Sequence, residues 1–361
     1  MVDAHPTIHW HALDDGRVQC DVCPRHCRLS EGQRGLCFVR ANQDSQVVLT
    51  TYGRSSGYCI DPIEKKPLNH FLPGTPVLSF GTAGCNLTCT FCQNWDISKS
   101  RAMDTLQDEA PPALIARAAD ALGCRSVAFT YNDPVIFMEY ALDTADACHA
   151  HGVRTVAVTA GYIAPRARRD FFAKMDAANI DLKAFTDGFY KKLCTAKLGA
   201  VLETLEYVYH ETQTWLEITT LLIPEANDSE REITALCEWV VDRLGVDVPL
   251  HFSAFHPDFR MKDRGRTPAQ TLQRARGIAK ALGLRHVYTG NVHDPVGQST
   301  YCHECGHTLV GRDRYVLSDW GFDAAGRCRR CKTPCPGQFE AVPGVWGARR
   351  QRVRLSDFRP T

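Results

Sequence analysis

The chain has 361 residues, 44% of them hydrophobic and 23% charged, so it can bury a large core, and one large domain with smaller additions is expected. The N-terminus has no basic or apolar targeting segment, and no run of about 18 apolar residues occurs, so we expect a cytoplasmic protein without membrane contact. The formal net charge is +1, and basic residues concentrate after Arg327 in a tail that could meet nucleic acid or form a solvated surface.

Seventeen cysteines in a cytoplasmic chain are not expected to form a disulfide framework, because the cytosol keeps thiols reduced. Cysteines grouped at ligand spacing instead predict metal sites. Three such groups follow one another along the chain: Cys20, Cys23, Cys27 and Cys37; Cys85, Cys89 and Cys92; and Cys302, Cys305, Cys328 and Cys331.

The first group has the spacing C-x2-C-x3-C-x9-C. Four thiolates in so short a stretch suit either a zinc ion or an auxiliary iron–sulfur cluster, and the spacing leaves both open. Pro24, Gly32 and Gly35 fit a tight loop wrapped around a metal. We therefore expect residues 1–75 to form an N-terminal cysteine-rich, metal-binding segment.

Residues 76–298 alternate short β-branched runs with helical patterns, which is typical of a parallel sheet built from βαβ units. The pattern predicts an α/β fold with a partial (β/α) TIM-type barrel, whose functional residues lie at the C-terminal ends of the strands. The predicted strands are residues 77–80, 126–131, 155–159, 179–183, 216–223, 250–255 and 286–289. The clearest predicted helices are residues 134–151, 201–213 and 267–282.

Cys85, Cys89 and Cys92 follow the first predicted strand of this barrel with the spacing C-x3-C-x2-C. Three thiolates can bind three irons of a [4Fe–4S] cluster and leave the fourth iron open to a cofactor or substrate, whereas a fourth protein ligand would make an ordinary electron carrier. The alternative is a zinc site completed by a distant cysteine or histidine.

This motif resembles that of the radical S-adenosylmethionine (SAM) superfamily. The resemblance implies a [4Fe–4S] cluster that cleaves SAM reductively to a 5′-deoxyadenosyl radical, which abstracts hydrogen from a substrate, and a flavodoxin- or ferredoxin-type reductant. It also implies that Phe91 packs near the adenine of SAM.

Further SAM contacts are implied at the ends of successive strands by the resemblance to activating enzymes of the same superfamily. These residues are Asp133, Thr159, Asp181, Lys183 and His256. Asp133 would hold the amino group of SAM, but it is one methylene shorter than the usual Glu. Ala160 stands where the superfamily commonly has asparagine. Each position alone could equally be a structural ion pair or a satisfied polar residue.

Longer segments are similar to the AmmeMemoRadiSam system radical SAM enzyme, a family akin to pyruvate formate-lyase activating enzymes. The matching segments are residues 23–27, 61–71, 84–87, 92–95, 255–259 and 288–291. The name of this family implies Memo-like and AMMECR-domain proteins as partners, but it identifies no substrate.

Catalytic candidates for the substrate end of the site are Lys65, Lys66 and Cys59. The two lysines, with Glu64 and His70, could line the substrate mouth as charged and acid–base groups, or form a solvated turn. The thiol of Cys59 could donate hydrogen to a substrate radical or be an ordinary buried cysteine.

Residues 299–361 contain two C-x2-C knuckles, Cys302 with Cys305 and Cys328 with Cys331, which predict a structural Zn²⁺ ribbon followed by the basic tail. Cys335 is a spare thiol that could compete as a ligand. A ribbon of this kind can bind nucleic acid or only stabilise a small core.

The leading hypothesis is therefore a radical SAM enzyme acting on an unidentified substrate. A second hypothesis is a glycyl-radical-enzyme activating protein, although no eight-cysteine ferredoxin-like insert follows Cys92. The chain could also be an RNA-modifying radical SAM enzyme, or a non-enzymatic iron–sulfur or zinc scaffold for the implied partners.

Overall fold

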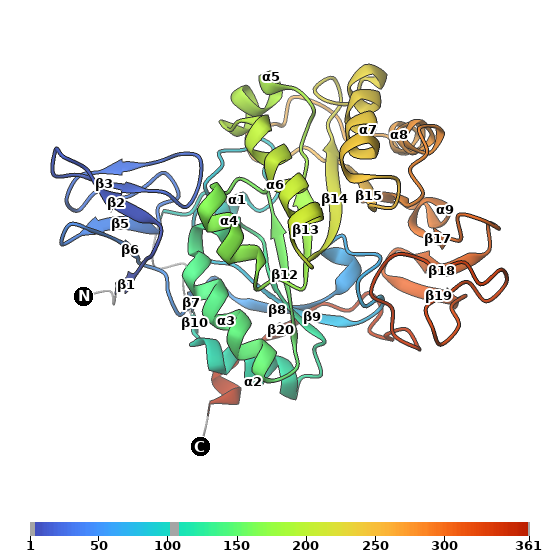
Figure 1. Cartoon of the computed structure of the whole chain (residues 1–361), viewed down its shortest axis with the longest axis horizontal. Helices are drawn as coiled ribbons and strands as arrows, with labels where there is room; N and C mark the ends of the chain where they lie inside the picture. The colour runs from blue at the N-terminus through green and yellow to red at the C-terminus, as the bar shows by residue number, and fades with distance from the viewer. Residues whose placement is uncertain (1–3, 102–107, 360–361) are drawn as a thin grey trace.

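The structure is a computed structural model that describes residues 4–101 and 108–359. A nine-stranded sheet lies at its centre, with the strand order β16-β15-β14-β13-β12-β11-β9-β8-β20 (Figure 1). Seven of these strands run parallel: β9 (Pro76–Phe80), β11 (Ser126–Phe129), β12 (Arg154–Thr159), β13 (Ala177–Asp181), β14 (Trp215–Leu222), β15 (Leu250–Ala254) and β16 (Val287–Gly290). They confirm the seven predicted strands, with ends that differ by at most two residues.

Two further strands extend this sheet at one edge, and the sequence pattern did not predict them. β8 (Tyr58–Pro62) pairs antiparallel with β9, and β20 (Gln351–Val353) pairs antiparallel with β8. Both come from the outer parts of the chain, so the sheet crosses the predicted boundaries at residues 75 and 298. Within the described residues, β16 and β20 are the two edges, so the parallel sheet is open rather than a closed barrel.

Helices cover one face of the sheet (Figure 1). The longer ones are α2 (Pro112–Ala121), α3 (Met138–Ala150), α4 (Pro165–Phe172), α6 (Leu198–Glu211), α7 (Glu230–Leu244) and α8 (Ala269–Ala281). The short ones are η1 (Ile63–Lys65), α1 (Trp95–Ser98), η3 (Pro134–Phe137), α5 (Asp187–Phe189), η4 (Tyr190–Cys194), α9 (Pro295–Gln298) and η5 (Leu355–Phe358).

Strand residues alternate between the helix-covered core and the opposite face of the sheet. Ile218 and Phe252 are fully buried in the core, whereas their chain neighbours Thr219 and Ser253 line a cavity. The parallel sheet therefore separates an apolar core from a polar interior space.

The N-terminal part forms two small antiparallel sheets, drawn in blue in Figure 1. One contains β1 (His5–Pro6), β6 (Gln46–Leu49) and β5 (Arg40–Gln43), and the other contains β2 (Trp10–Ala12), β3 (Val18–Cys20) and β4 (Arg28–Leu29). A short pair formed by β7 (Arg54–Ser55) and β10 (Asp108–Glu109) follows. A buried ion pair, 2.5 Å between Arg40 Nη2 and Glu139 Oε2, ties the first small sheet to α3.

The C-terminal part forms a three-stranded sheet of β17 (Thr300–Tyr301), β18 (Thr308–Asp313) and β19 (Val316–Trp320). It packs against the segment between η1 and β9. The Leu72 and Gln338 amides donate hydrogen bonds of 2.8 and 2.7 Å to the carbonyls of Gln338 and His70. Buried Arg312 donates to the Asn69 carbonyl at 2.7 Å. The C-terminal part is therefore held by these hydrogen bonds against the segment that leads into β9 of the main sheet.

No helix in the described ranges is long and apolar enough to cross a membrane.

Candidate active site

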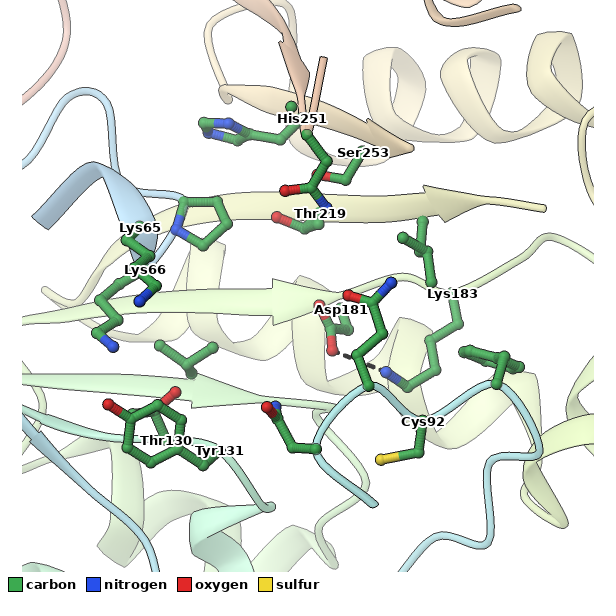
Figure 2. Close-up of a pocket in the computed structure, with 18 of the residues that line it drawn as sticks. Lys65, Lys66, Cys92, Thr130, Tyr131, Asp181, Lys183, Thr219, His251 and Ser253 are labelled. Atoms are coloured by element: carbon green, nitrogen blue, oxygen red, sulfur yellow. Dashed lines mark hydrogen bonds and ion pairs between the residues drawn. The ribbon is translucent and has the colours of Figure 1, made fainter. Parts of the chain in front are cut away.

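A cavity of about 1080 Å³ lies against the polar face of the parallel sheet. Its wall combines strand residues, the loop after β9, the segment around η1 and the turn between β18 and β19. In Figure 2, Lys65 and Lys66 lie near the starts of the strands, whereas Cys92 and Lys183 lie near their arrowheads. The cavity therefore runs along the strands, with a cysteine end and a lysine end.

The loop that carries the central cysteines is fixed by Asn132, which follows β11. The Asn132 side-chain amide donates to the Gly84 carbonyl at 2.8 Å, and its oxygen accepts from the Thr82 amide at 3.1 Å. Gly84 has φ +81°, and a Cβ there would overlap the Cys37 carbonyl. Only glycine fits both this backbone conformation and this close approach. The loop therefore reaches Cys85 in one defined position.

Cys85, Cys89 and Cys92 all line the cysteine end of the cavity. Two sulfurs that share one zinc ion, each at about 2.3 Å, lie no more than about 4.6 Å apart. Among the described residues, two groups of His, Cys, Asp and Glu have all donor atoms within 4.8 Å of one another, and neither contains these three cysteines. Three thiolates on one loop beside a large cavity suit three irons of a cluster, so the donor set fits a [4Fe–4S] cluster.

Cys194 lies next to this group, and it stands at no ligand spacing from other cysteines in the sequence. It belongs to η4, whose Leu193 and Cys194 carbonyls accept hydrogen bonds from the Thr90 and Thr88 amides at 3.0 and 3.1 Å. A hydrogen bond from the Cys194 thiol, together with nearby lysines, lowers the pKa of Cys89 to about 6. The contact depends on the tertiary fold, so no local spacing could have predicted it.

Asp133 lies at the end of β11 with its carboxylate on the cavity wall. Oδ1 accepts hydrogen bonds from the Thr159 hydroxyl at 2.9 Å and the Val135 amide at 3.1 Å, and Oδ2 accepts from the Ala160 amide at 3.2 Å. Burial raises the pKa of Asp133 to about 6. The structure thus brings Asp133, Thr159 and Ala160 together, and Ala160 contributes its main chain.

Asp181 and Lys183 form an ion pair of 2.7 Å at the end of β13, which lies two strands from β11 in the same sheet (Figure 2). Burial opposes the charge on Lys183, but Asp181 and Cys89 raise its pKa well above the ordinary range. Lys183 is therefore held as a cation beside the cysteines. Thr219 also lines the cavity, and its buried hydroxyl has no hydrogen-bond partner within the described part of the chain.

Phe91 and His256 differ in their relation to the cavity. Phe91 is buried and lines the cavity, with its ring 5.5 Å from that of Phe189. His256 does not line the cavity; its Nδ1 lies 2.8 Å from Nε2 of Gln93, which does. The expected contact of His256 with SAM stays a prediction; in the structure His256 reaches the cavity wall through Gln93.

The lysine end of the cavity is organised around Asp61, which is fully buried. Its carboxylate binds Lys65 Nζ at 2.9 Å and Lys66 Nζ at 2.8 Å, and it accepts from the Tyr131 hydroxyl at 2.9 Å. Burial lowers the pKa of Lys66 to about 8 against the opposing effect of Asp61. Both lysines line the cavity, so this turn is not merely solvated.

Residues of the C-terminal part complete the lysine end. Arg312, Arg314 and Tyr315 line the cavity from β18 and the turn that follows it. Arg312 Nε lies 3.8 Å from the Glu64 carboxylate, and burial, with Asp61 and Glu64 nearby, raises the pKa of Tyr315. The sequence did not predict that the C-terminal part lines the cavity, because this depends on how that part packs against the segment around η1.

Two expected cavity residues lie elsewhere. Cys59 is buried in β8, where its sulfur accepts from Arg350 Nε at 3.2 Å, and it does not line the cavity. His70 is fully buried outside the cavity, with its ring nitrogens 2.5 Å from the Tyr288 hydroxyl and 2.6 Å from the Pro336 carbonyl. The side chain of His70 points toward the C-terminal part instead of into the cavity.

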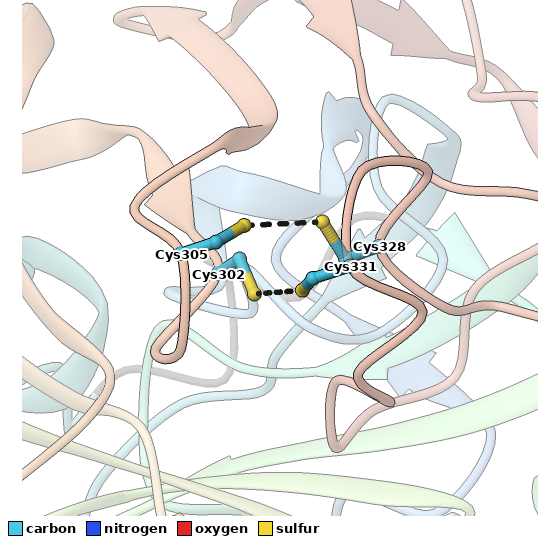
Figure 3. Close-up of side chains that lie close together, drawn as sticks. All are labelled: Cys302, Cys305, Cys328 and Cys331. Carbon is cyan, nitrogen blue, oxygen red and sulfur yellow. Dashed lines mark hydrogen bonds between the residues drawn. The ribbon is translucent and has the colours of Figure 1, made fainter.

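The four C-terminal cysteines face one another (Figure 3). The sulfurs of Cys302 and Cys331 are 3.4 Å apart, those of Cys305 and Cys328 are 3.7 Å apart, and all four lie within 4.8 Å of one another. This arrangement fits a single tetrahedral ion. Cys335 does not join it but lies in a second close group with His70 and His286.

Comparisons with known proteins give a consistent result. Residues 80–237 match the family model of the Radical SAM superfamily. Over 325 residues the chain is 39% identical to the uncharacterized protein MJ0808 of Methanocaldococcus jannaschii, covering 90% of this chain and 96% of that protein.

Similar solved structures include a domain of pyruvate-formate lyase-activating enzyme from Bacteroides vulgatus, with 20% identity and a TM-score of 0.41 over 46% of this chain and 99% of that chain. Streptococcus suis SuiB bound to S-adenosylmethionine has 14% identity and a TM-score of 0.49 over 64% of this chain and 53% of that chain. A radical SAM methyltransferase from Sphaerobacter thermophilus has 17% identity and a TM-score of 0.47 over 85% and 82%.

Proposed function

Because this chain belongs to the radical SAM superfamily, we propose that Cys85, Cys89 and Cys92 hold a [4Fe–4S] cluster at which SAM is cleaved reductively. The observation that carries the proposal is that three cysteines, spaced too widely to share one ion, face the end of a large cavity. When bound, the cluster and SAM would supply a 5′-deoxyadenosyl radical that abstracts hydrogen from a substrate.

The chain's own residues would bind and orient SAM at this end. Asp133 offers a buried carboxylate for the ammonium group, and Lys183 offers a partly buried cation for the carboxylate. Thr159 and the Ala160 amide hold the Asp133 carboxylate in place. Phe91 supplies an apolar surface for the adenine. These roles use groups of opposite charge that follow β11 and β13, as a zwitterionic amino-acid group requires.

We further propose that the substrate is a small anionic molecule bound at the lysine end. The residues that line the cavity include seven Lys or Arg and three Asp or Glu. The cations are Lys65, Lys66, Lys99, Lys183, Arg266, Arg312 and Arg314, and the acids are Glu64, Asp133 and Asp181. Such an excess of cations favours a carboxylate or phosphate group in the substrate.

The enclosed position of Lys66 favours a small molecule over RNA or a glycyl-radical protein. Its side chain is 3% exposed and lines the wall of the cavity. We retain a flavodoxin- or ferredoxin-type reductant, and Memo-like and AMMECR-domain proteins, as proposed partners. We also propose Zn²⁺ as the ion for the C-terminal cysteines.

The proposal is tested by anaerobic reconstitution with iron and sulfide, reduction with dithionite and addition of SAM, followed by mass spectrometry of the products. The wild type is expected to release 5′-deoxyadenosine and methionine in equal amounts, and Cys89→Ala is expected to release neither. Cys237→Ala, which changes a buried cysteine of α7, is the matched control and should retain activity. Methylthioadenosine, or 5′-deoxyadenosine from Cys89→Ala, would contradict the proposal.

A further inference from the structure

Four cysteines of the N-terminal part surround one small pocket: Cys20, Cys23, Cys27 and Cys37. A Cβ placed on Gly35 would lie 3.7 Å from the sulfurs of both Cys27 and Cys37, so these two sulfurs converge on the same space. The remaining wall is mostly apolar, and consists of Val22, Leu36, Val135 and Ile136 with Arg25, Gly35, Arg40 and Asn86. Four thiols around one apolar pocket indicate a bound metal centre.

The distances between these sulfurs distinguish a single ion from a cluster. No three of the four N-terminal sulfurs lie within 4.8 Å of one another, whereas the C-terminal cysteines do as a complete group of four. Ligands of one zinc ion at about 2.3 Å cannot be farther apart than about 4.6 Å. In this respect the N-terminal group resembles Cys85, Cys89 and Cys92, which also form no single-ion group. The geometry therefore favours a cluster over zinc.

The charge beside the pocket suits a cluster with four thiolate ligands, which carries net negative charge. Arg40 lines the pocket and is 2% exposed. Its guanidinium is held by the Ile136 carbonyl at 3.0 Å and by Glu139. A buried cation fixed next to the sulfurs offsets the cost of placing an anionic cluster in an apolar environment.

The pocket also touches the loop that carries the central cysteines. Asn86, the residue after Cys85, forms part of its wall, and its carbonyl accepts from Arg25 Nε at 2.8 Å. Gly84 packs directly on the Cys37 carbonyl. The two cysteine groups are therefore separated by directly contacting main chain, which provides a short route for an electron.

We propose that Cys20, Cys23, Cys27 and Cys37 hold a second [4Fe–4S] cluster that relays electrons to the cluster at Cys85, Cys89 and Cys92. In each transfer a ferredoxin- or flavodoxin-type carrier loses one electron, the second cluster is reduced and then reoxidised, and the central cluster gains that electron. No bond or proton changes in these steps. The relay rests on the proposed function, but the presence of the second cluster does not.

The first test is metal and sulfide analysis of the full chain reconstituted anaerobically. We expect about eight irons, eight sulfides and one zinc per chain, and about four irons in the variant Cys85→Ala/Cys89→Ala/Cys92→Ala. Mössbauer spectra of that variant should show a four-iron cluster that SAM does not alter. About four irons with two zinc ions in the wild type, or a folded triple variant without iron, would overturn the proposal.

A second variant fills the pocket without removing a thiol. Gly35→Leu should retain only about four irons, because its side chain would point between Cys27 and Cys37. Gly277→Leu on the exposed face of α8, where a Cβ meets nothing within 4 Å, is the matched control and should keep eight. Full iron content in Gly35→Leu would contradict the site.

The relay is tested separately by the reductant. With reduced ferredoxin, Gly35→Leu should cleave SAM at least tenfold more slowly than the wild type, and with dithionite at a similar rate. If Gly35→Leu cleaved SAM as fast as the wild type with reduced ferredoxin as well as with dithionite, the relay would be excluded. Failure of the wild type to cleave SAM with either reductant would contradict the proposed function while leaving the iron count as a test of the second cluster.

Discussion

At the scale of single residues, the cysteine end of the cavity is built from side chains that follow separate strands of the sheet. The triplet from Cys85 to Cys92 lies on the cavity wall, because a loop after a strand of a parallel sheet must lie at the carboxyl edge. Cys194 could not be predicted, since it reaches Cys89 only through the packing of η4. His256 follows a strand end as expected, but it contacts Gln93 of the cavity wall and does not line the cavity itself.

Asp133→Asn tests the ammonium-binding role. Hydrogen bonds to charged groups contribute roughly 1.5–3 kcal/mol, so SAM should bind about tenfold more weakly or worse. Because the pKa of Asp133 is about 6, binding to the wild type should weaken as pH falls through that value. Equilibrium dialysis measures both effects. Asp120→Asn, at an exposed position of α2, is the control, and equal affinity in the two variants would refute the role.

At the scale of secondary-structure elements, the sequence predicted the parallel strands because they form short, mostly buried runs that alternate with helical patterns. β20 has three residues, too few for a periodic signal, and it exists because β8 offers an unpaired edge. The turn between β18 and β19 carries cavity residues that no local pattern indicated.

Arg314→Gln tests whether this turn recognises an anion. Phosphate and succinate should raise the melting temperature of the wild type, and that increase should fall by at least half in the variant, at constant ionic strength. Arg330→Gln, the control, changes an exposed arginine inside the second knuckle that does not line the cavity. An unchanged increase in Arg314→Gln would show that the turn does not contribute to the anion site.

The cysteines Cys302, Cys305, Cys328 and Cys331 are expected to stabilise the C-terminal part, which contains this turn. Cys305→Ser should lose bound zinc and lower the melting temperature by several degrees, because the folded state then lacks a metal that holds both knuckles. Cys335→Ser should keep one zinc per chain, since its sulfur lies with His70 and His286. Elemental analysis and calorimetry measure both variants, and zinc retained by Cys305→Ser would contradict this ligand set.

At the scale of the whole molecule, three parts of the chain meet around one cavity. The sheet supplies one wall, the segment at η1 supplies the lysines, and the C-terminal part closes the lysine end. The sequence indicated the separate parts but not their joint surface, because contacts such as Arg312 with the Asn69 carbonyl join residues far apart in the chain. The open sheet also leaves space that the C-terminal part occupies.

The junction of these parts should be sensitive to acid. Burial lowers the pKa of His70 and His286 to about 3, with further lowering of His286 by Lys280, His303 and Arg285, and of His70 by His286 against the effect of Glu217. The unfolded chain binds protons near pH 6.5 and the folded chain does not. Stability should therefore fall as pH decreases from about 6.5 toward 3, by of the order of 1 kcal/mol per pH unit for each histidine.

Urea unfolding at pH 5.0 and 7.5 measures this dependence. His286→Phe should show a smaller loss of stability between the two values than the wild type. His210→Phe, at an exposed position of α6, is the control. The same loss in His286→Phe and the wild type would contradict the buried-histidine explanation.

The central claim is that the cluster at Cys85, Cys89 and Cys92 has an iron open to SAM. Electron paramagnetic resonance of the reduced protein, before and after addition of saturating SAM, tests it directly. The signal of one cluster is expected to shift on binding, and the shift should be absent from Cys85→Ala/Cys89→Ala/Cys92→Ala. A spectrum of the wild type that SAM leaves unchanged would contradict the claim.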